Sequence, residues 1–181
     1  MKGNFKKSLT LIRIVEGGND DDKDDPGGRT SRGITQREWD AYRTLSAEKN
    51  LPQDVWEAPD WAINYVYWHS YWLPWGETDW FRVGVDYSYT DMRVHHGGYW
   101  ATRILQRALG VKDDGHIGIV TKTALMQSDS AVLIRAIHAR RTAYMAKLYW
   151  FRKFGKGWIA RNDFVERRAL KMLPSQEPVS V

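Results

Sequence analysis

The residues of this chain best suited to catalysis lie near its N-terminus, where Glu16 ends an apolar stretch and an acidic loop follows. Asp25 stands nine residues after Glu16, and Thr30 stands fourteen residues after it. Hydrolysis of a glycosidic bond needs a carboxylic acid that protonates the leaving oxygen. An inverting enzyme also needs a second group, about 6.5–9.5 Å away, that activates water. Because apolar neighbours raise the pKa of a carboxyl group, the segment predicts acid–base hydrolysis, with Glu16 as the acid and the loop supplying its partner.

Two other interpretations of the acidic loop involve no catalysis. An Asp-rich loop can be a solvated turn and nothing more. Asp20, Asp22 and Asp24 alternate, which suggests a calcium site, but an EF-hand loop beginning at Asp20 needs glycine at position 25 and glutamate at position 31. The chain has Asp25 and Ser31 there. That form of calcium site is therefore rejected, and no metal is expected.

A helix over residues 5–16 is expected to position Glu16. One of its faces carries, at helical spacing, the apolar residues Phe5, Leu9, Ile12 and Val15. Two glycines follow Glu16, as is typical of a helix C-terminus. The loop from Asn19 to Ser31 holds five Asp, one Pro and two Gly, which predicts irregular structure. Glu16 should therefore lie where a buried helix opens into this loop.

Further helices are expected along the rest of the chain. Thr35 and Glu38 have the spacing of a capping box and predict a helix that continues to residue 45, followed by a connection over 46–60. The other expected helices span 61–72, 81–94, 99–109, 121–126, 133–148 and 163–172, with breaks at 73–76, at Gly97–Gly98 and at Gly155 and Gly157. No segment shows convincing strand alternation, so the fold is predicted to be mainly α.

The segment that begins at Glu16 resembles the signature of glycoside hydrolase family 108. It reads E-G-G, six residues, then D-P-G-G-x-T-x-x-G-I-T. The members of this family are N-acetylmuramidases, found as phage endolysins and as bacterial muramidases associated with secretion. The resemblance implies a lysozyme-like helical fold of two tightly packed lobes. It also implies hydrolysis of the β-1,4 bond between N-acetylmuramic acid and N-acetylglucosamine, with no cofactor.

The same resemblance assigns roles to individual residues. It maps the family's proposed catalytic acid onto Glu16. By analogy with phage-type lysozymes, Asp25 and Thr30 handle the attacking water, which suggests inversion. Asp22 is the rival to Asp25, since it matches a family Asp slightly earlier in the loop.

Further motifs resemble the family's pattern and give expected substrate-binding residues. Tyr67, Tyr71 and Trp72 match a Y-x-x-x-Y-W segment and are expected to form part of the sugar groove or its supporting wall. The DMRVHHG segment at 91–97 resembles D-F-A-V-N-x-G, which implies that Asp91 and His95 also bind substrate. His95 stands where the family has Asn, and a structural role is favoured over a metal-binding one for the His pair at 95–96.

The second half of the chain resembles a predicted peptidoglycan-binding domain. The ILQRALGVKDDGHIGIVTKTAL segment from Ile104 matches its glycine turns, which are structural features. The expected domains are therefore a muramidase catalytic lobe over 1–98 and a peptidoglycan-binding-like helical lobe over 99–181. Whether the second lobe binds glycan or only completes the core is left open. The KGWIAR segment that ends at Arg161 resembles a family G-W-x-x-R element and is expected to pack structurally.

Composition excludes several classes of protein. The chain of 181 residues has no Cys, so a disulfide framework, a thiolate metal site and a Cys nucleophile are all impossible. Its 10 Trp, 9 Tyr and 5 Phe suit a dense aromatic core or a groove that stacks on sugar rings, and for any single Trp the core is favoured. No apolar run is long enough for a membrane span.

The charge is uneven and favours a polyanionic partner. Residues 1–100 hold 12 Lys and Arg against 16 Asp and Glu, whereas residues 101–181 hold 15 against 6. Solvated helix faces are the simpler explanation of this basic surplus, and adsorption to the anionic wall is the functional one. The expected partner is bacterial peptidoglycan, with no nucleic acid because no reader motif is present, and with no stable membrane insertion. We expect a monomer.

The apolar stretch near the N-terminus carries Arg13 and is a poor signal-peptide core. The expectation is synthesis in a bacterial host cytoplasm and action on the cell wall in the periplasm after holin-type release. The main alternative function is a non-catalytic wall-binding or virion structural module. The presence of Glu16, Asp25 and Thr30 argues against this alternative, since a degenerate member could lose them freely.

Overall fold

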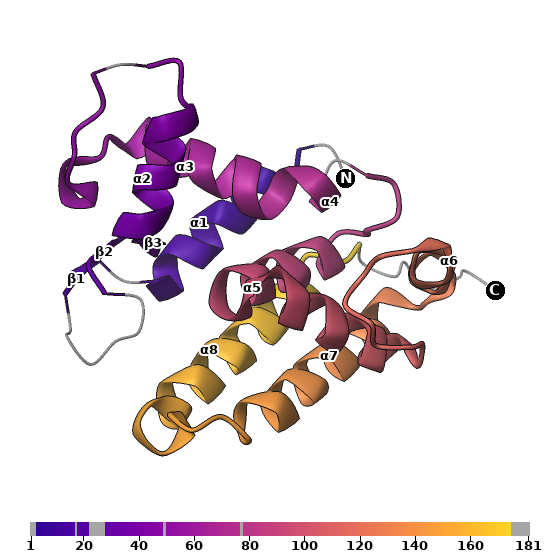
Figure 1. Ribbon diagram of the computed structural model, residues 1–181. Helices are drawn as coiled ribbons and strands as arrows, with labels where there is room; N and C mark the ends of the chain where they lie inside the picture. Colours follow the sequence, from indigo (N-terminus) through magenta and orange to yellow (C-terminus); the bar gives the residue numbers. More distant parts are fainter. Residues whose placement is uncertain (1–2, 17, 22–27, 49, 77, 175–181) are drawn as a thin grey trace. The chain divides into compact units, whose positions relative to one another are not determined.

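The computed structural model describes residues 3–16, 18–21, 28–48, 50–76 and 78–174 (Figure 1). The chain folds into two compact units. Residues 5–74 form the first, here called the N-terminal unit, and residues 75–181 together with 1–4 form the second, here called the C-terminal unit. Helices dominate the described residues of both units. The prediction of a mainly α, lysozyme-like fold is therefore confirmed.

The N-terminal unit combines helices with a small antiparallel sheet. Its elements are α1 (Phe5–Glu16), β1 (Asn19–Asp20), β2 (Thr30–Ser31), β3 (Ile34–Thr35), α2 (Gln36–Leu45), the short 3₁₀ helix η1 (Val55–Glu57), α3 (Asp60–Val66) and the π-helical segment η2 (Tyr67–Trp72). The helix α4 (Leu73–Gly76) follows η2 and contains the junction with the next unit. The side chains that form the core of the unit include Ile12, Ile34, Trp39, Val55, Ile63 and Trp72.

The C-terminal unit is built from four longer helices, α5 (Val85–Leu109), α6 (Ile119–Gln127), α7 (Ser130–Met145) and α8 (Phe151–Leu170). Figure 1 shows α7 and α8 side by side, and α5 packs against both. The aromatic and aliphatic side chains in its core include Phe81, Tyr87, Tyr89, Met92, Ile104, Ile134 and Ile137. The prediction that a given Trp belongs to the core holds for Trp39 and Trp72, whereas the other eight Trp are half-buried or exposed.

Several local predictions are confirmed. The helix before Glu16 spans the expected residues. Thr35 and Glu38 form the capping box, since the Glu38 N–H donates to Thr35 Oγ1 at 3.2 Å and the Thr35 N–H donates to Glu38 Oε2 at 3.0 Å. The long helix α5 is divided at Gly97, whose φ of 76° and ψ of 159° are not helical. Glycine was expected to separate two helices there.

Other local predictions are wrong. The loop from Asn19 to Ser31 is not irregular throughout, because its two ends pair as β1 and β2. The segment 73–76 was expected to break the helix but forms α4. Gly155 and Gly157 lie inside α8, whereas they were expected to end the preceding helix. A Cβ at position 155 would stand 2.9 Å from the Phe151 ring, so this glycine lets an aromatic ring lie against the helix backbone.

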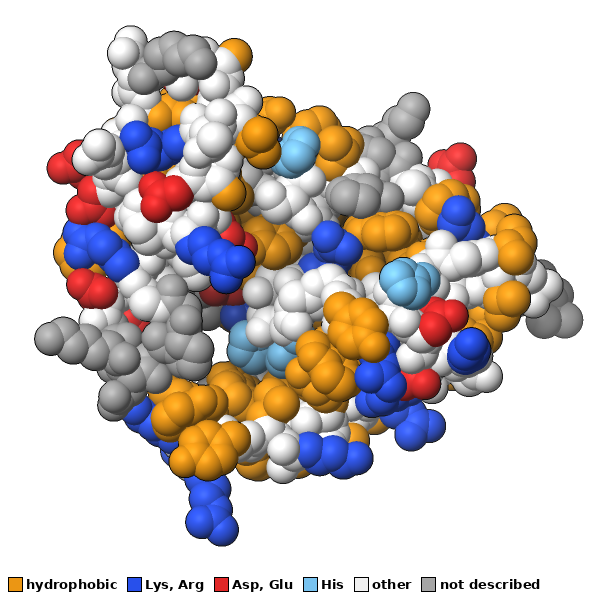
Figure 2. Space-filling model, viewed as in Figure 1, with side chains coloured by type: hydrophobic (Ala, Val, Ile, Leu, Met, Phe, Trp, Pro, Cys, Tyr) orange, Lys and Arg blue, Asp and Glu red, His pale blue; other side chains and the backbone are white. Residues whose placement is uncertain are grey.

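The basic surplus of the second half of the chain lies mostly on exposed helix faces. Figure 2 shows Lys and Arg side chains scattered over the face in view. The exposed ones on α7 and α8 are Arg135, Arg140, Arg152, Lys153, Lys156, Arg167 and Arg168. Arg141 is an exception, because its side chain is fully buried. Among the described residues, no helix combines the length and the apolar character that a membrane crossing requires.

Candidate active site

Glu16 is the last residue of α1, and its side chain is half-buried. Leu9 and Ile12 anchor this helix, since only 7% and 1% of their surfaces are exposed. The C-terminal end of a helix carries a partial negative charge, which disfavours an ionised carboxylate beside it. The position of Glu16 therefore suits a carboxyl group that must hold a proton.

The small sheet holds the two ends of the acidic loop together next to α1. Asn19 and Asp20 of β1 pair with Ser31 and Thr30 of β2, and the hydroxyl of Thr30 donates to the carbonyl oxygen of Gly28 at 2.8 Å. Thr30 is thus held at the base of the loop. Asp22 and Asp25 lie outside the described residues, so both assignments stay predictions.

A tight turn between β2 and β3 brings the backbone onto Glu16. The turn residues Arg32 and Gly33 have φ values of 51° and 81°, and positive values at both positions are what a two-residue hairpin favours. A Cβ at Gly33 would stand 2.8 Å from Glu16 Oε2 and 2.2 Å from the hydroxyl oxygen of Tyr67. The carboxyl group of Glu16 and the phenol of Tyr67 therefore converge on the same point of the backbone.

Tyr71 extends this cluster from Tyr67 to α2. The rings of the two tyrosines lie 5.7 Å apart, and the Tyr71 hydroxyl donates to Glu38 Oε1. Burial raises the pKa of the Tyr71 phenol well above its usual value, and the Glu38 carboxylate adds to the rise. Tyr67 and Glu16 act in the same direction. Two of the predicted substrate-binding tyrosines thus lie with the predicted acid in one cluster of the N-terminal unit.

Trp72 lies in the hydrophobic core of the N-terminal unit. None of its surface is exposed, and its ring lies 5.6 Å from the ring of Phe5. This burial suits the supporting wall that was one of its two expected places. Contact with sugar stays a prediction.

Asp91 is the centre of a buried ion-pair network in the C-terminal unit. One carboxylate oxygen accepts from Arg141 at 2.6 Å and the other from Arg161 at 2.7 Å. Burial alone would raise the pKa of Asp91, but the charges of Arg161 and Arg141 outweigh it and hold that pKa below its usual value. Both oxygens are engaged and unexposed, so its assignment as a substrate-binding residue stays a prediction without support from its surroundings.

The histidines that follow Asp91 have Arg141 as their common partner. The guanidinium of Arg141 lies 3.0 Å from His95 Nδ1 and 3.0 Å from His96 Nε2. Burial lowers the pKa of both imidazoles, that of His96 to about 3, and the charge of Arg141 lowers them further. Neutral imidazoles can accept from a guanidinium. The favoured structural role of these histidines agrees with these contacts, and the substrate role of His95 stays a prediction.

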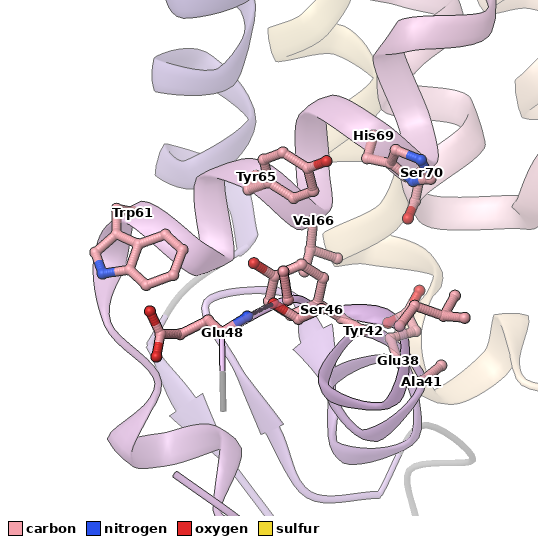
Figure 3. A pocket seen from close by; sticks show the side chains of 12 residues that line it. Glu38, Ala41, Tyr42, Ser46, Glu48, Trp61, Tyr65, Val66, His69 and Ser70 are labelled. Carbon is pink, nitrogen blue, oxygen red and sulfur yellow. Dashed lines mark hydrogen bonds between the residues drawn. The ribbon is translucent and has the colours of Figure 1, made fainter. Parts of the chain in front are cut away.

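A separate pocket opens between α2 and α3 (Figure 3). Its volume is about 670 Å³, and its lining residues include Tyr42, Trp61, Tyr65 and His69. Glu38 lines it as well, whereas the predicted site residues of the described chain do not. The pocket therefore adjoins the tyrosine cluster through one shared residue, Glu38.

The chain resembles known proteins over nearly its whole length. The family model of glycosyl hydrolase 108 matches residues 9–97, a range that contains Glu16, Gly33, Tyr67 and Tyr71. A solved structure of SagA from Brucella abortus is 32% identical, with a TM-score of 0.83, and the match covers 98% of each chain. This chain belongs to glycosyl hydrolase family 108. No curated protein sequence matches it.

As a family 108 member, the chain is a glycoside hydrolase that cleaves peptidoglycan. A second family model, described as a predicted peptidoglycan domain, matches residues 100–163, and it supports peptidoglycan as the substrate. The two models meet between residues 97 and 100, whereas the compact units divide between 74 and 75. The domain boundary expected at 98/99 stays a prediction.

Two members of the cluster around Glu16 and the tyrosines were not identified as such from the sequence. Glu38 was expected only as a capping residue, but it also accepts a hydrogen bond from the Tyr71 hydroxyl. Gly33 was noted only as part of the motif, but it is where the backbone meets Glu16. A local signal existed for Gly33, because glycine beside Arg32 between two short extended segments suits a tight turn. The pairing of Glu38 with Tyr71 joins residues 33 positions apart and has no local signal.

Proposed function

We propose that this enzyme is an N-acetylmuramidase that hydrolyses the β-1,4 bond between N-acetylmuramic acid and N-acetylglucosamine, with Glu16 as its catalytic acid. The observation that carries the proposal is the convergence of the Glu16 carboxyl group, the Tyr67 hydroxyl and the Gly33 backbone at the end of α1. This arrangement supports an acid whose position is fixed by its surroundings, which proton transfer to a leaving oxygen requires.

In the proposed reaction, protonated Glu16 gives its proton to the bridging oxygen as the bond to the anomeric carbon breaks. Asp25, or its rival Asp22, accepts a proton from the attacking water, and Thr30 helps to hold that water. A water attack from the opposite face of the sugar inverts the anomeric carbon. The step is balanced: the anomeric carbon gains the hydroxyl of water, the leaving oxygen gains the proton of Glu16, and the second carboxylate takes up the other proton of water.

The test is the replacement Glu16→Gln, which keeps the size of the side chain and removes the acid. The rate of reducing-sugar release from purified murein should fall by a factor of about 10²–10⁴. Glu57→Gln is the matched control, because Glu57 is an exposed glutamate of the same unit, and it should keep the parent rate. A Glu16→Gln variant as active as the parent would falsify the assignment.

The bond cleaved is tested on the products. Muropeptides released by the parent enzyme are reduced with borohydride and analysed by mass spectrometry. Cleavage by a muramidase leaves a reducing N-acetylmuramic acid, so the reduced sugar should carry the lactyl group and its peptide. A reduced N-acetylglucosamine would mean that the other glycosidic bond is cut.

We further propose that the enzyme is a phage endolysin that acts as a monomer on the periplasmic wall after holin-type release. The need for release is supported by the place of the substrate, because peptidoglycan lies outside the cytoplasmic membrane. Expression in a Gram-negative host with and without a holin tests the proposal. Lysis should require the holin, and equal lysis without it would point to another route of export.

A further inference from the structure

Tyr67, whose hydroxyl meets Glu16 at Gly33, and Tyr71, whose ring lies 5.7 Å from that of Tyr67, both donate their hydroxyl protons to other acceptors. Tyr67 donates to the carbonyl oxygen of Arg32 at 2.9 Å, and Tyr71 donates to Glu38 Oε1. A phenol carries a single proton and otherwise only accepts. Any further hydrogen bond to either phenol oxygen must therefore be donated by the other group.

Glu38 is held as the acceptor of Tyr71 by the capping box. Its second oxygen, Oε2, accepts from the Thr35 backbone at 3.0 Å and from the Thr35 hydroxyl at 2.9 Å. These contacts fix the carboxylate at the start of α2. The Tyr71 hydroxyl therefore points its proton at Glu38, the capping residue of α2, and not at Glu16.

We propose that Tyr67 and Tyr71 are positioning residues that keep Glu16 protonated, because each phenol can offer Glu16 only an acceptor. An ionised Glu16 would face the lone pairs of the Tyr67 oxygen, whereas a protonated Glu16 can donate to that oxygen. Tyr71, next to Tyr67 and with its own proton held by Glu38, adds no donor. This inference rests on the proposed function, since it concerns how the proposed acid holds its proton. It gives the capping residue Glu38 a second role, in the chemistry of the site.

The other charged groups around this cluster have partners of their own. Arg13 of α1 contacts Asp60 at 3.1 Å, and Arg32 contacts the same carboxylate at 2.5 Å. Arg29 contacts Asp54 at 2.5 Å and Asp21 at 3.3 Å. Other charged groups on the sheet and on the elements packed against it include Asp20 on β1, Arg37 on α2 and Glu57 on η1, all of them exposed. Arg13, Arg29 and Arg32 therefore each have at least one carboxylate with which to share their charge.

The variants Tyr71→Phe and Tyr67→Phe test the proposal through the pH dependence of kcat/KM. The alkaline limb of this profile reports the pKa of the acid in the free enzyme. Loss of one accepting oxygen should move that limb to lower pH by about half to one unit. The carboxyl signal of Glu16, followed by ¹³C NMR with selectively labelled glutamate, should move by the same amount.

Glu38→Gln is the sharper variant, because glutamine retains the capping box. Its amide can donate to Tyr71, which frees the phenol proton to point toward Glu16 and stabilises the ionised form. The alkaline limb should again move to lower pH, with the thermal unfolding midpoint close to that of the parent. If Glu38 has only a structural role, the alkaline limb of the kcat/KM profile should stay at the pH of the parent.

Tyr65→Phe is the control, since Tyr65 lies on α3 with 44% of its surface exposed and stacks on His69. It should leave the limb unchanged. Suppose that Glu16→Gln abolishes cleavage, but that the alkaline limb of kcat/KM and the NMR titration of Glu16 keep the parent values in Tyr67→Phe, Tyr71→Phe and Glu38→Gln. This inference is then wrong, and the proposed function stands. If Glu16→Gln remains active, the proposed function itself fails. The NMR titration tests the inference even in a variant too slow to assay.

Discussion

At the scale of single residues, Gly33 is constrained in two ways that both involve Glu16. Its φ of 81° lies in the region that L-residues with a side chain rarely adopt. The space where a Cβ would stand is also taken by Glu16 and by the hydroxyl of Tyr67. The turn thus does more than reverse the chain, because its backbone limits where the carboxyl group of Glu16 can lie.

Gly33→Ala is expected to damage both stability and catalysis. The backbone strain should lower the free energy of unfolding by roughly 1–3 kcal/mol. The displaced Glu16 carboxyl should lower kcat by about 10- to 100-fold, since small shifts of a catalytic group are costly. Urea unfolding and murein hydrolysis measure the two effects.

Gly110→Ala separates the two causes of that damage. Gly110 also has a positive φ, of 72°, but apart from its chain neighbours no atom of the described residues lies within 4 Å of its added Cβ. This variant should lose about 1 kcal/mol of stability and keep the parent kcat. An equal loss of kcat in both variants would mean that strain alone, rather than contact with Glu16, explains the effect.

At the scale of elements, some local signals in the sequence predicted where a helix begins or breaks, and others were misleading. Thr35 and Glu38 act on each other across three residues, so a capping box can be recognised without knowing the fold. Gly97 likewise interrupts α5 through its own backbone angles. Gly155 was misleading because its role depends on the ring of Phe151, one turn earlier, and a helix held by such packing tolerates a glycine.

The contacts that build the site were harder to predict, because they join distant elements. The motif around Glu16 indicated the acid and Thr30, yet the neighbours of Glu16 come from the β2–β3 turn and from η2. For Asp91, too, the contacts of the side chain come from distant elements. Its motif suggested a substrate contact, but Arg141 and Arg161, on α7 and α8, enclose its carboxylate.

The capping box of α2 gives a prediction at this scale. Thr35→Ala removes the side chain that accepts from the Glu38 N–H, so the free energy of unfolding should fall by about 1 kcal/mol. Thr44→Ala, at the exposed end of the same helix, is the control and should change it by less than about 0.5 kcal/mol. Chemical unfolding monitored by circular dichroism measures both variants. Equal effects would show that the cap is not a particular source of stability.

At the scale of the whole molecule, stability should depend on pH through histidines buried among helices. His138 has 1% of its surface exposed and contacts Asn162 at 2.7 Å and Ser88 at 3.1 Å. These contacts join α7 to α8 and α5. Burial lowers the pKa of His138 to about 4, and burial lowers that of His96 to about 3. The C-terminal unit therefore folds around imidazoles that are neutral at pH 7.

This arrangement predicts a loss of stability in mild acid. In the unfolded chain a histidine has a pKa of about 6.5, so above that value neither state binds the proton and stability is complete. As the pH falls from 6.5 toward 4, the unfolded chain takes up a proton that folded His138 does not. The free energy of unfolding should then fall by about 2 kcal/mol between pH 7 and pH 5 from this group alone. His138→Gln should flatten the dependence, measured by urea unfolding at several pH values, whereas Ser88→Ala keeps the imidazole and should retain it. The same slope in His138→Gln as in the parent would place the acid sensitivity in other groups.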